Sequence, residues 1–157
     1  MRTTPALLVL AALAVPFVAP AQEAGCTYER CALRLQHRFF SGTRIVEGAS
    51  ASRHIATVGM FVGRIPIFES ASDSARRHYT AFRSSQNRGS VLGVIAAIAL
   101  GASVGVASSP NGAEHKTAVW TLFGVGVVFA IPAGVNMTKA QDELQQAIWH
   151  YNRGLGR

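Results

Sequence analysis

The chain has 157 residues, of which 49% are hydrophobic and 15% charged, and its formal charge is +7. An average soluble domain carries about 25% charged residues, so this composition favours a membrane protein. The apolar residues are concentrated in three blocks, at 6–21, 91–107 and 117–137. The first two blocks leave only about 67 residues between them, too few for a soluble core of catalytic size. No motif in the chain specifies a biochemical activity.

The first apolar block is typical of an export signal. Arg2 precedes an apolar run over 6–15, and Ala19-Pro20-Ala21 has the small-x-small pattern of a signal peptidase site. We predict a signal peptide over 1–21, cleaved after Ala21. The alternative, an uncleaved anchor, would have an apolar run shorter than the roughly 20 residues that span a bilayer.

The cationic composition indicates both a source and a partner. Arg outnumbers Lys by 13 to 2, which is typical of a GC-rich bacterial genome, and an export signal then places the chain in the cell envelope. An exported chain meets anionic lipid before it meets nucleic acid, so lipid headgroups are the expected counter-charge. We therefore expect the lipid bilayer as a partner, an unknown protein partner or self-association besides it, no nucleic acid and no cofactor.

Two uncharged runs are long enough to cross a membrane. Residues 89–108 would rise about 30 Å as a helix, and residues 117–137 form a run of similar length. Pro132 bends rather than breaks a helix in a membrane. The segment 109–116 between the runs contains Pro-Asn-Gly, which is strong turn chemistry, and the only charges of this region. The sequence predicts an antiparallel helical hairpin.

Small residues recur at every fourth position of both predicted spans, a spacing expected to line one face of each helix. They are Gly89, Gly93, Ala97, Gly101 and Gly105 in the first span and Gly126, Ala130 and Gly134 in the second. Over residues 89–137 this pattern resembles the glycine-zipper two-helix proteins of bacterial envelopes. The resemblance implies close packing or oligomerisation. We favour packing within the hairpin, so that a side chain as large as Ile at Gly101 should separate the helices.

An amphipathic helix is predicted over 70–88, before the first span. Ser70-Ala-Ser-Asp73 has the form of a capping box, and apolar residues follow at helical spacing and run on toward Gly89. The helix is therefore expected to continue into the span, with Gly89 as the site of any bend. Its basic residues lie mostly on the other face, where they would either bind lipid headgroups or form a simple solvated face. They are Arg76, Arg77, Arg83 and Arg88.

A small sheet is predicted between the signal and this helix. Apolar and polar residues alternate from Leu33 to Phe39, Ser41-Gly42 is a plausible hairpin turn, and a second strand follows over 43–47. A further extended stretch is expected over 55–61, with another over 65–68. So small a sheet cannot fold alone, and we expect it to lean on the membrane, on a partner or on the helix over 70–88.

The two cysteines, Cys26 and Cys31, follow the predicted cleavage site, in a compartment where a disulfide can persist. We predict that they form one, with irregular backbone between them, because regular structure would point the two side chains apart. A metal site would need further ligands, with His37 or His54 recruited from outside any recognised spacing. We therefore expect no metal.

One string resembles a catalytic motif. Gly101-Ala-Ser103-Val-Gly105 matches the G-x-S-x-G nucleophile elbow, which requires a strand–turn–helix corner with acid and His partners. Here the string lies inside an apolar span rich in small residues, where chance matches are common. We interpret it as chance and predict no catalytic residue.

A C-terminal amphipathic helix is predicted over 138–157. Thr138 and Gln141 form a capping-box pattern, and apolar residues from Ala140 to Tyr151 share one face. Trp149 and Tyr151 are side chains that favour the headgroup zone, which makes this an interfacial helix. Docking onto residues 22–70 as ordinary core is the open alternative.

Together these elements predict a mainly α membrane protein: a two-span transmembrane helical hairpin with a small α+β exoplasmic N-terminal module and a C-terminal amphipathic helix. The expected division is 1–21 signal peptide, 22–69 disulfide-containing β-rich module, 70–88 basic helix, 89–108 and 117–137 transmembrane helices, 109–116 hairpin loop, and 138–157 C-terminal helix and tail.

Orientation and function follow from the same pattern. The export signal places the module outside the inner membrane, whereas the positive-inside rule opposes this because most basic residues flank the spans on the module side. We follow the export signal, since a segment of about 67 residues approaches the length at which translocation no longer responds to charge. The expected function is that of a non-enzymatic envelope scaffold or regulator, and the alternative is an oligomeric pore.

Overall fold

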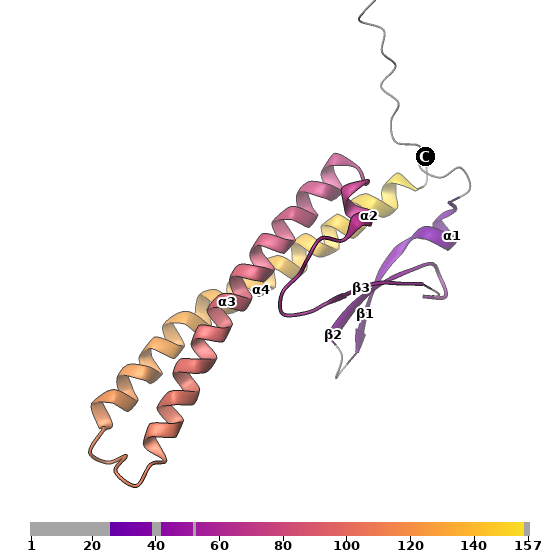
Figure 1. The fold of residues 1–157 in the computed structure, drawn as a ribbon. Coiled ribbons are helices and arrows are strands. Elements are labelled where there is room, and N and C mark those ends of the chain that lie inside the picture. The colour runs from indigo at the N-terminus through magenta and orange to yellow at the C-terminus, as the bar shows by residue number, and fades with distance from the viewer. Residues whose placement is uncertain (1–25, 39–41, 52, 156–157) are drawn as a thin grey trace, which may run out of the picture.

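The computed structural model describes residues 26–38, 42–51 and 53–155, so the predicted signal peptide lies outside the described residues. The elements in chain order are α1 (Tyr28–Cys31), β1 (Leu33–Arg38), β2 (Gly42–Glu47), β3 (Arg53–Val58), α2 (Pro66–Glu69), α3 (Asp73–Ala107) and α4 (Lys116–Gly154). Figure 1 shows α3 and α4 side by side as a long antiparallel hairpin, with the sheet beside the end opposite the connection. The predicted hairpin and small sheet are thus both present.

Helix α3 runs without interruption from the amphipathic segment into the apolar one, as predicted, and passes straight through Gly89. Its N-cap is Ser72, whose Oγ accepts a hydrogen bond from the Ala75 N–H at 3.4 Å. The expected cap, Ser70, instead donates its hydroxyl to the Ile67 carbonyl, just after α2 ends. The N-cap therefore lies two residues after the predicted one, where the chain leaves α2.

Helix α4 is one helix of 39 residues that contains Pro132 and Thr138. The prediction that a new helix begins at Thr138 is wrong. Its hydroxyl donates to the Gly134 carbonyl at 3.2 Å, one turn back within the same helix, and so does not act as a cap. The apolar face continues in phase across this position, and nothing in the pattern requires a break.

The sheet is antiparallel, in the order β1-β2-β3, with Leu33 opposite Glu47 and a register shift at Ile45/Val46. The first two predicted strands are confirmed, and the third begins at Arg53, slightly before the predicted stretch. The extended segment expected over 65–68 is wrong, because α2 begins there. Pro66 occupies its first helical position, where the fixed φ of proline suits a helix and its missing N–H is not needed.

The core lies where the sheet, the loop after β3 and the two long helices meet. It contains Leu33, Ile45, Val62, Ile65, Phe68, Tyr79, Phe82, Ala140, Leu144, Ala147 and Ile148. The ring of Phe68 stacks on that of Tyr79, with centroids 4.6 Å apart. The sheet module thus packs against the helix predicted over 70–88, which is one of the three supports expected. The C-terminal part of α4 packs on the same module as ordinary core.

Two asparagines fasten the module to the helices. Asn152 of α4 accepts a hydrogen bond from the Leu33 N–H at 2.7 Å and donates to the Leu33 carbonyl at 2.9 Å. Asn87 of α3 makes the same pair with Val62, at 2.9 and 3.4 Å. Each side-chain amide pairs with the backbone as a neighbouring strand would, and so satisfies polar groups that the core would otherwise leave unpaired.

The predicted disulfide between Cys26 and Cys31 is present, with the Cα atoms 5.7 Å apart. The backbone between the two cysteines is more regular than expected. Thr27 is extended, and the four-residue helix α1 then brings Cys31 back toward Cys26. The change from extended to helical backbone allows the two side chains to meet.

Candidate functional site in the apolar half of the hairpin

The hairpin has two halves of different character. We call residues 73–88 with 138–154 the proximal half, because they pack on the sheet, and residues 89–107 with 116–137 the distal half. Both halves share one seam of buried residues at seven-residue spacing: Ala75, Phe82, Gly89, Ala96 and Ser103 on α3, and Gly126, Ala133, Ala140 and Ala147 on α4. This spacing keeps one face of each helix against the other in a left-handed supercoil.

In the distal half the seam consists of small residues only, so the two backbones approach closely. A Cβ added to Gly89 would lie 3.2 Å from the Ala133 carbonyl oxygen. One added to Gly126 would lie 2.5 Å from Cγ of Leu100, which packs over this glycine, and 3.3 Å from the Ala96 carbonyl oxygen. Both glycines belong to the predicted packing set, and they are required by close approach rather than by an unusual backbone angle.

The predicted four-residue stripe does not follow this seam. Each step of four residues turns the helix about 40° beyond a full turn, so the stripe winds about 160° around the helix between Gly89 and Gly105. A Cβ on Gly101, Gly105 or Gly134 would meet nothing within 4 Å in the part of the chain that the structure describes. Ala97 and Ala130 are exposed, whereas Gly93 remains half-buried near Ala133 and Met137.

The predicted packing of the complete stripe is therefore wrong, and the open space at Gly101 removes the reason to expect that Ile there separates the helices. Packing within the hairpin follows alternating steps of three and four residues, because only their mean of 3.5 keeps pace with two helices that coil around each other. The exposed members of the stripe are left on the outer surface of the hairpin.

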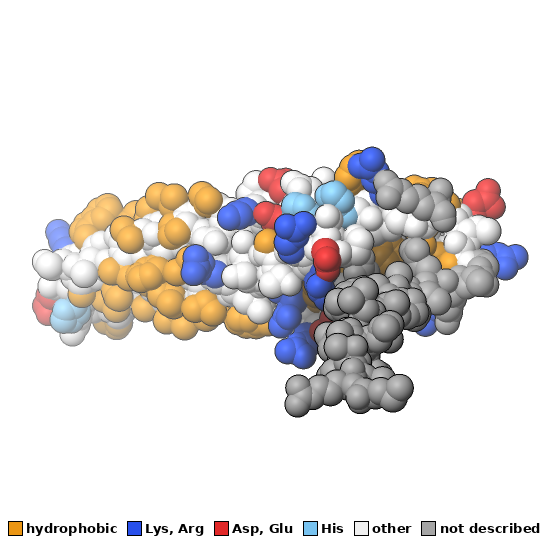
Figure 2. All heavy atoms as spheres, turned by 90° about the horizontal axis from the view of Figure 1, so that it is seen from above, with side chains coloured by type: hydrophobic (Ala, Val, Ile, Leu, Met, Phe, Trp, Pro, Cys, Tyr) orange, Lys and Arg blue, Asp and Glu red, His pale blue; other side chains and the backbone are white. Residues whose placement is uncertain are grey.

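Large apolar side chains cover the outside of the distal half. The exposed ones are Val91, Val94, Ile95, Ile98, Val104, Trp120, Phe123, Val125, Val127, Val128, Ile131 and Val135. Figure 2 shows hydrophobic side chains gathered in two bands along the distal half, with basic side chains toward the middle of the hairpin. Contiguous apolar patches of this kind mark a surface that meets a membrane or another protein.

Both long helices are long and apolar enough to cross a membrane. Only 22% of the most apolar window of α3 and 11% of that of α4 is buried, whereas the core helix of a soluble protein would be mostly buried. Length and composition alone are weak grounds for a membrane location. The low burial shows that these apolar windows are not part of the core described above.

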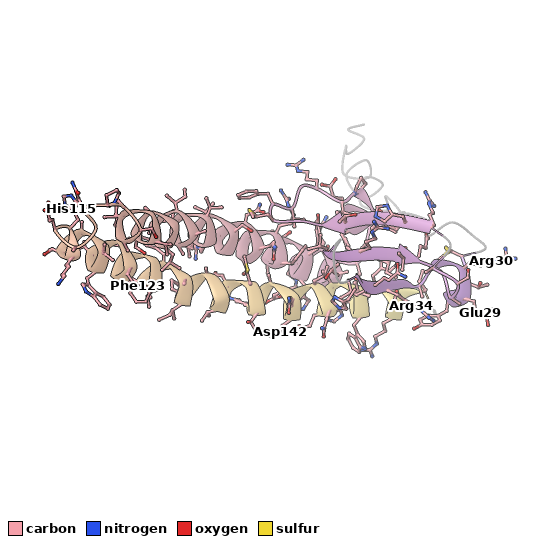
Figure 3. All side chains as sticks on the ribbon, turned by 90° about the horizontal axis from the view of Figure 1, so that it is seen from below. Glu29, Arg30, Arg34, His115, Phe123 and Asp142 are labelled. Atoms are coloured by element: carbon pink, nitrogen blue, oxygen red, sulfur yellow. A yellow bond between two sulfur atoms is a disulfide. The ribbon has the colours of Figure 1, made fainter. Side chains whose placement is uncertain are left out.

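Charged residues delimit the apolar surface at both ends. Arg88 and Lys139 are exposed at its base, and Glu114, His115 and Lys116 are exposed at its tip. Figure 3 places His115 at that tip, at the far end of the molecule from the sheet. About 20 helical residues separate the two levels, a rise of about 30 Å, which equals the thickness of a bilayer hydrocarbon core.

The four arginines predicted to bind headgroups do not share one level. Arg88 lies at the base of the apolar surface, but Arg76 and Arg77 lie about 17–18 Å farther along α3. Arg76 is paired with Asp73, and Arg83 is half-buried, with an Nε atom that has no hydrogen-bond partner in the described structure. Lys139 joins Arg88 from the other helix, a pairing that only the hairpin geometry reveals.

The loop after β3 is fixed to α3 at this same level. Gln86 donates to the Gly59 carbonyl at 3.1 Å, Ser90 donates to the Met60 carbonyl, and Asn87 holds the backbone of Val62. Met60 and Phe61 are each 59% exposed. The loop therefore presents two large apolar side chains beside the base of the apolar surface.

Two histidines of the proximal half interact with neighbouring side chains. The Nδ1 atom of His78 lies 2.7 Å from a carboxylate oxygen of Glu143, and the His78 ring stacks on that of His150. Burial raises the pKa of the Tyr79 phenol above its ordinary value, although its hydrogen bond to the backbone acts the other way. Burial also raises the pKa of Tyr151, and the nearby Glu47 carboxylate adds to the effect.

The remaining candidates from the sequence are Ser103, His37 and His54, and each makes a local hydrogen bond within its own element or sheet. Ser103 lies within α3 and donates its hydroxyl to the Leu100 carbonyl at 2.8 Å, so the local backbone is a helix and not a nucleophile elbow. His37 and His54 pair with Thr43 and Thr57 on the sheet.

Within the described ranges, one set of potential ligand atoms lies together, those of Cys26, Cys31 and Glu47. The disulfide uses both of its sulfur atoms. Only the Glu47 carboxylate remains as a donor there, and it is paired with Arg53 at 3.4 Å.

Tyr151 and Trp149 do not lie at the base of the apolar surface. They are about 15–18 Å beyond Lys139 along α4, where Tyr151 packs edge-on against Phe68 and the Arg153 guanidinium lies over the Trp149 ring. Phe123 and Trp120, in edge-to-face contact, are the aromatic side chains exposed near the tip.

Comparison of the chain with protein-family models, with curated proteins and with solved structures finds no match. The chemistry and geometry of the hairpin therefore carry the functional argument.

Proposed function

We propose that this protein is a non-enzymatic membrane protein of the bacterial envelope, whose distal half crosses the bilayer and whose sheet module acts as a scaffold or interaction unit at the membrane surface. One observation carries the proposal: large apolar side chains lie outside the distal half and small ones inside it. In water this arrangement would be unfavourable, because the large apolar side chains would be exposed to solvent. In lipid it is favourable, because Val and Ile meet hydrocarbon while small residues allow the helices to pack.

The dimensions support the same conclusion. The apolar surface is as long as a hydrocarbon core is thick, and charges stand at both of its ends. Met60 and Phe61 lie at the base level, where a bilayer would accept apolar and aromatic side chains at its interface. Arg88 and Lys139 lie there too, within reach of anionic headgroups.

A scaffold role is supported by the way the module is held. The Asn152 and Asn87 pairs and the shared core fix the sheet to the part of the hairpin just above the bilayer. Strand β3 stands at the edge of the sheet, beyond β2, so its outer edge can receive a strand of a partner protein. The module would thus be presented at a fixed height and angle.

The two tryptophans provide a direct test. Trp120 lies in the distal half and is 70% exposed, whereas Trp149 lies in the proximal half and is 54% exposed. The chain contains no other tryptophan. Trp149→Phe and Trp120→Phe therefore give two matched single-tryptophan proteins, which can be reconstituted in vesicles and compared with the same quenchers.

We expect brominated lipid to quench Trp120 strongly and Trp149 weakly, and aqueous iodide outside the vesicles to do the reverse. Resistance of the protein to extraction from membranes by alkaline carbonate should accompany this result. Equal iodide quenching of both tryptophans, with release of the protein by carbonate, would show that the distal half is not embedded.

For orientation, we propose that the module is exoplasmic and the tip at 109–116 cytoplasmic. In intact cells a membrane-impermeant maleimide should label Arg77→Cys on the module side and leave Ser109→Cys at the tip unlabelled until lysis. Both positions are exposed in the fold. The opposite labelling pattern would show that the positive-inside rule prevails over the export signal.

A second candidate is an oligomeric pore, favoured by one observation. Ala97, Gly101 and Gly105 form an exposed strip on α3 where a helix of another copy could approach closely. Rapid ion leakage from vesicles that contain purified protein, abolished by Gly101→Ile, would support the pore. Retention of ions by vesicles in which Trp120 is shown to be embedded would support the scaffold.

A further inference from the structure

A hollow of about 230 Å³ lies between α3 and α4 at the base of the apolar surface. It is lined by Ala81, Ser84, Ser85, Arg88, Asn136 and Lys139. Its α3 residues lie on one helix face, with steps of three, one and three residues, and its α4 residues are separated by three. This face of α3 differs from the one that binds the loop after β3 through Gln86, Asn87 and Ser90. The hollow thus remains open although the module is docked.

The lining has the chemistry of an anion site. Arg88 and Lys139 approach it from different helices, and within the described residues no carboxylate lies at ion-pair distance from either. Ser84 and Ser85 add hydroxyl groups. Two cations and hydroxyl donors around one small hollow match the oxygen atoms of a phosphate group, which accepts charge-assisted hydrogen bonds in several directions.

The surface below the hollow indicates where this phosphate comes from. On α3, Arg88 is followed toward the tip by exposed Val91, Ile95 and Ile98, at helical spacing on the same side. On α4, Lys139 is followed toward the tip by exposed Val135, Ile131 and Val128. Each cation therefore stands at the head of an apolar stripe, which is the arrangement that a phosphate with acyl chains attached requires.

We propose that the hollow binds the phosphate group of one anionic phospholipid, whose acyl chains lie along the two stripes. The proposal rests on the proposed membrane location and adds to it a defined site with one bound lipid, in place of a diffuse basic face. Basic pockets between membrane helices at the headgroup level bind anionic lipids in this way. Arg76 and Arg77, far above this level, take no part in the site.

The test uses the full chain in neutral detergent, with native mass spectrometry to count bound lipid. The probes are short-chain phosphatidylglycerol, phosphatidylcholine of the same chain length, and inorganic phosphate. The site variant is Arg88→Gln/Lys139→Gln. The matched control is Arg30→Gln/Arg77→Gln, which removes the same charge from exposed positions outside the hollow. Arg88→Lys/Lys139→Arg exchanges the cations and keeps both charges.

We expect one phosphatidylglycerol to bind per chain, and the affinity to fall about 30-fold in the site variant, as expected for the loss of two cations near a lipid phosphate. The control should change little, and the charge-preserving exchange should retain binding. Failure of a large excess of inorganic phosphate to displace the lipid would assign the site to lipid. Full displacement would assign it to free phosphate.

An equal loss of phosphatidylglycerol affinity in the site variant and the control would overturn the proposal, because it would show that only the overall surface charge matters. Equal binding of phosphatidylcholine and phosphatidylglycerol would overturn it too. These outcomes are separate from failure of the membrane proposal. Binding is measured in detergent, whereas embedding is measured by the tryptophan experiment, so a protein that embeds without selective binding loses only this inference.

Discussion

The proximal and distal halves of the hairpin are built on the same two helices and the same seven-residue seam, yet their side chains are arranged in opposite ways. In the proximal half large residues such as Phe82 and Leu144 are buried, and Arg77 is exposed. In the distal half small residues are buried, while Ile98 and Val128 are exposed. The seam determines how the two helices pack against each other. Whether the large residues lie inside or outside the hairpin depends on what surrounds each half.

This contrast is what a chain that passes from water into lipid requires. In water, burial of large apolar side chains stabilises the fold, and the sheet supplies the surface that covers them. In hydrocarbon that driving force disappears, and close contact between small residues remains to hold the helices together.

The largest difference is expected between two phenylalanines. Phe82 is 1% exposed in the proximal core, and Phe123 is 46% exposed on the distal surface. Phe82→Ala should lower the free energy of unfolding by about 3–5 kcal/mol, because it leaves a cavity in a packed core. Phe123→Ala should change it by less than about 1 kcal/mol. Denaturant unfolding in mild detergent would measure both, and equal losses would remove the distinction between the halves.

The second comparison concerns two glycines of α3. Gly89→Ile would place its Cβ 3.1 Å from Met137 Cγ and 3.2 Å from the Ala133 carbonyl oxygen, so the helices must separate, at a cost of about 2–3 kcal/mol. Gly101→Ile adds the same side chain in open space, and its expected effect is close to zero. Thermal unfolding of both variants would measure the difference. A greater loss at Gly101 would restore the four-residue stripe as the packing surface.

The third prediction concerns the attachment of the module. Asn152→Ala removes both partners of the buried Leu33 backbone and should lower the free energy of unfolding by about 1–2 kcal/mol. Asn111→Ala, at the exposed hairpin tip, is the matched control and should have almost no effect. Faster hydrogen exchange in β1 of Asn152→Ala, with unchanged exchange in the distal helices, would localise the loss to the module.

The smallest expected effect is pH-dependent and confined to the proximal half. The pKa of Tyr151 in the folded chain is raised above its ordinary value of 10.0 by burial and by Glu47. The unfolded chain therefore releases this proton at a lower pH than the folded chain does. The free energy of unfolding is consequently at its full value below pH 10 and falls as the pH rises through the folded pKa. Tyr151→Phe should reduce this alkaline loss. Melting temperatures of both proteins between neutral pH and pH 11, about one unit above the ordinary pKa, would reveal it. An unchanged alkaline slope would contradict it.

The sequence alone predicted the local elements. Uncharged runs of 20 residues indicated two long helices, and alternation from Leu33 onward indicated a strand. The position of Cys26 and Cys31 after a predicted export signal indicated their disulfide. These features depend on nearest neighbours along the chain and on the period of the backbone. Hence they could be recognised without knowledge of the fold.

Other features required the tertiary structure. The four-residue repeat of glycines is conspicuous in the sequence, but the direction of Gly101 depends on how far the helices coil around each other, which the partner helix determines. The continuity of α4 through Thr138 likewise depends on packing, since a capping pattern is used only where the helix must begin.

Composition and the period of the apolar residues were enough to predict a long apolar hairpin with a small disulfide-containing sheet, because both act locally along the chain. The tertiary structure alone decided which residues meet. It brought Arg88 and Lys139 to one hollow, fastened Leu33 to Asn152 across 119 positions of the chain, and placed Met60 and Phe61 beside the base of the apolar surface. Such contacts depend on how the helices and the sheet dock in three dimensions, and no spacing along the chain encodes them.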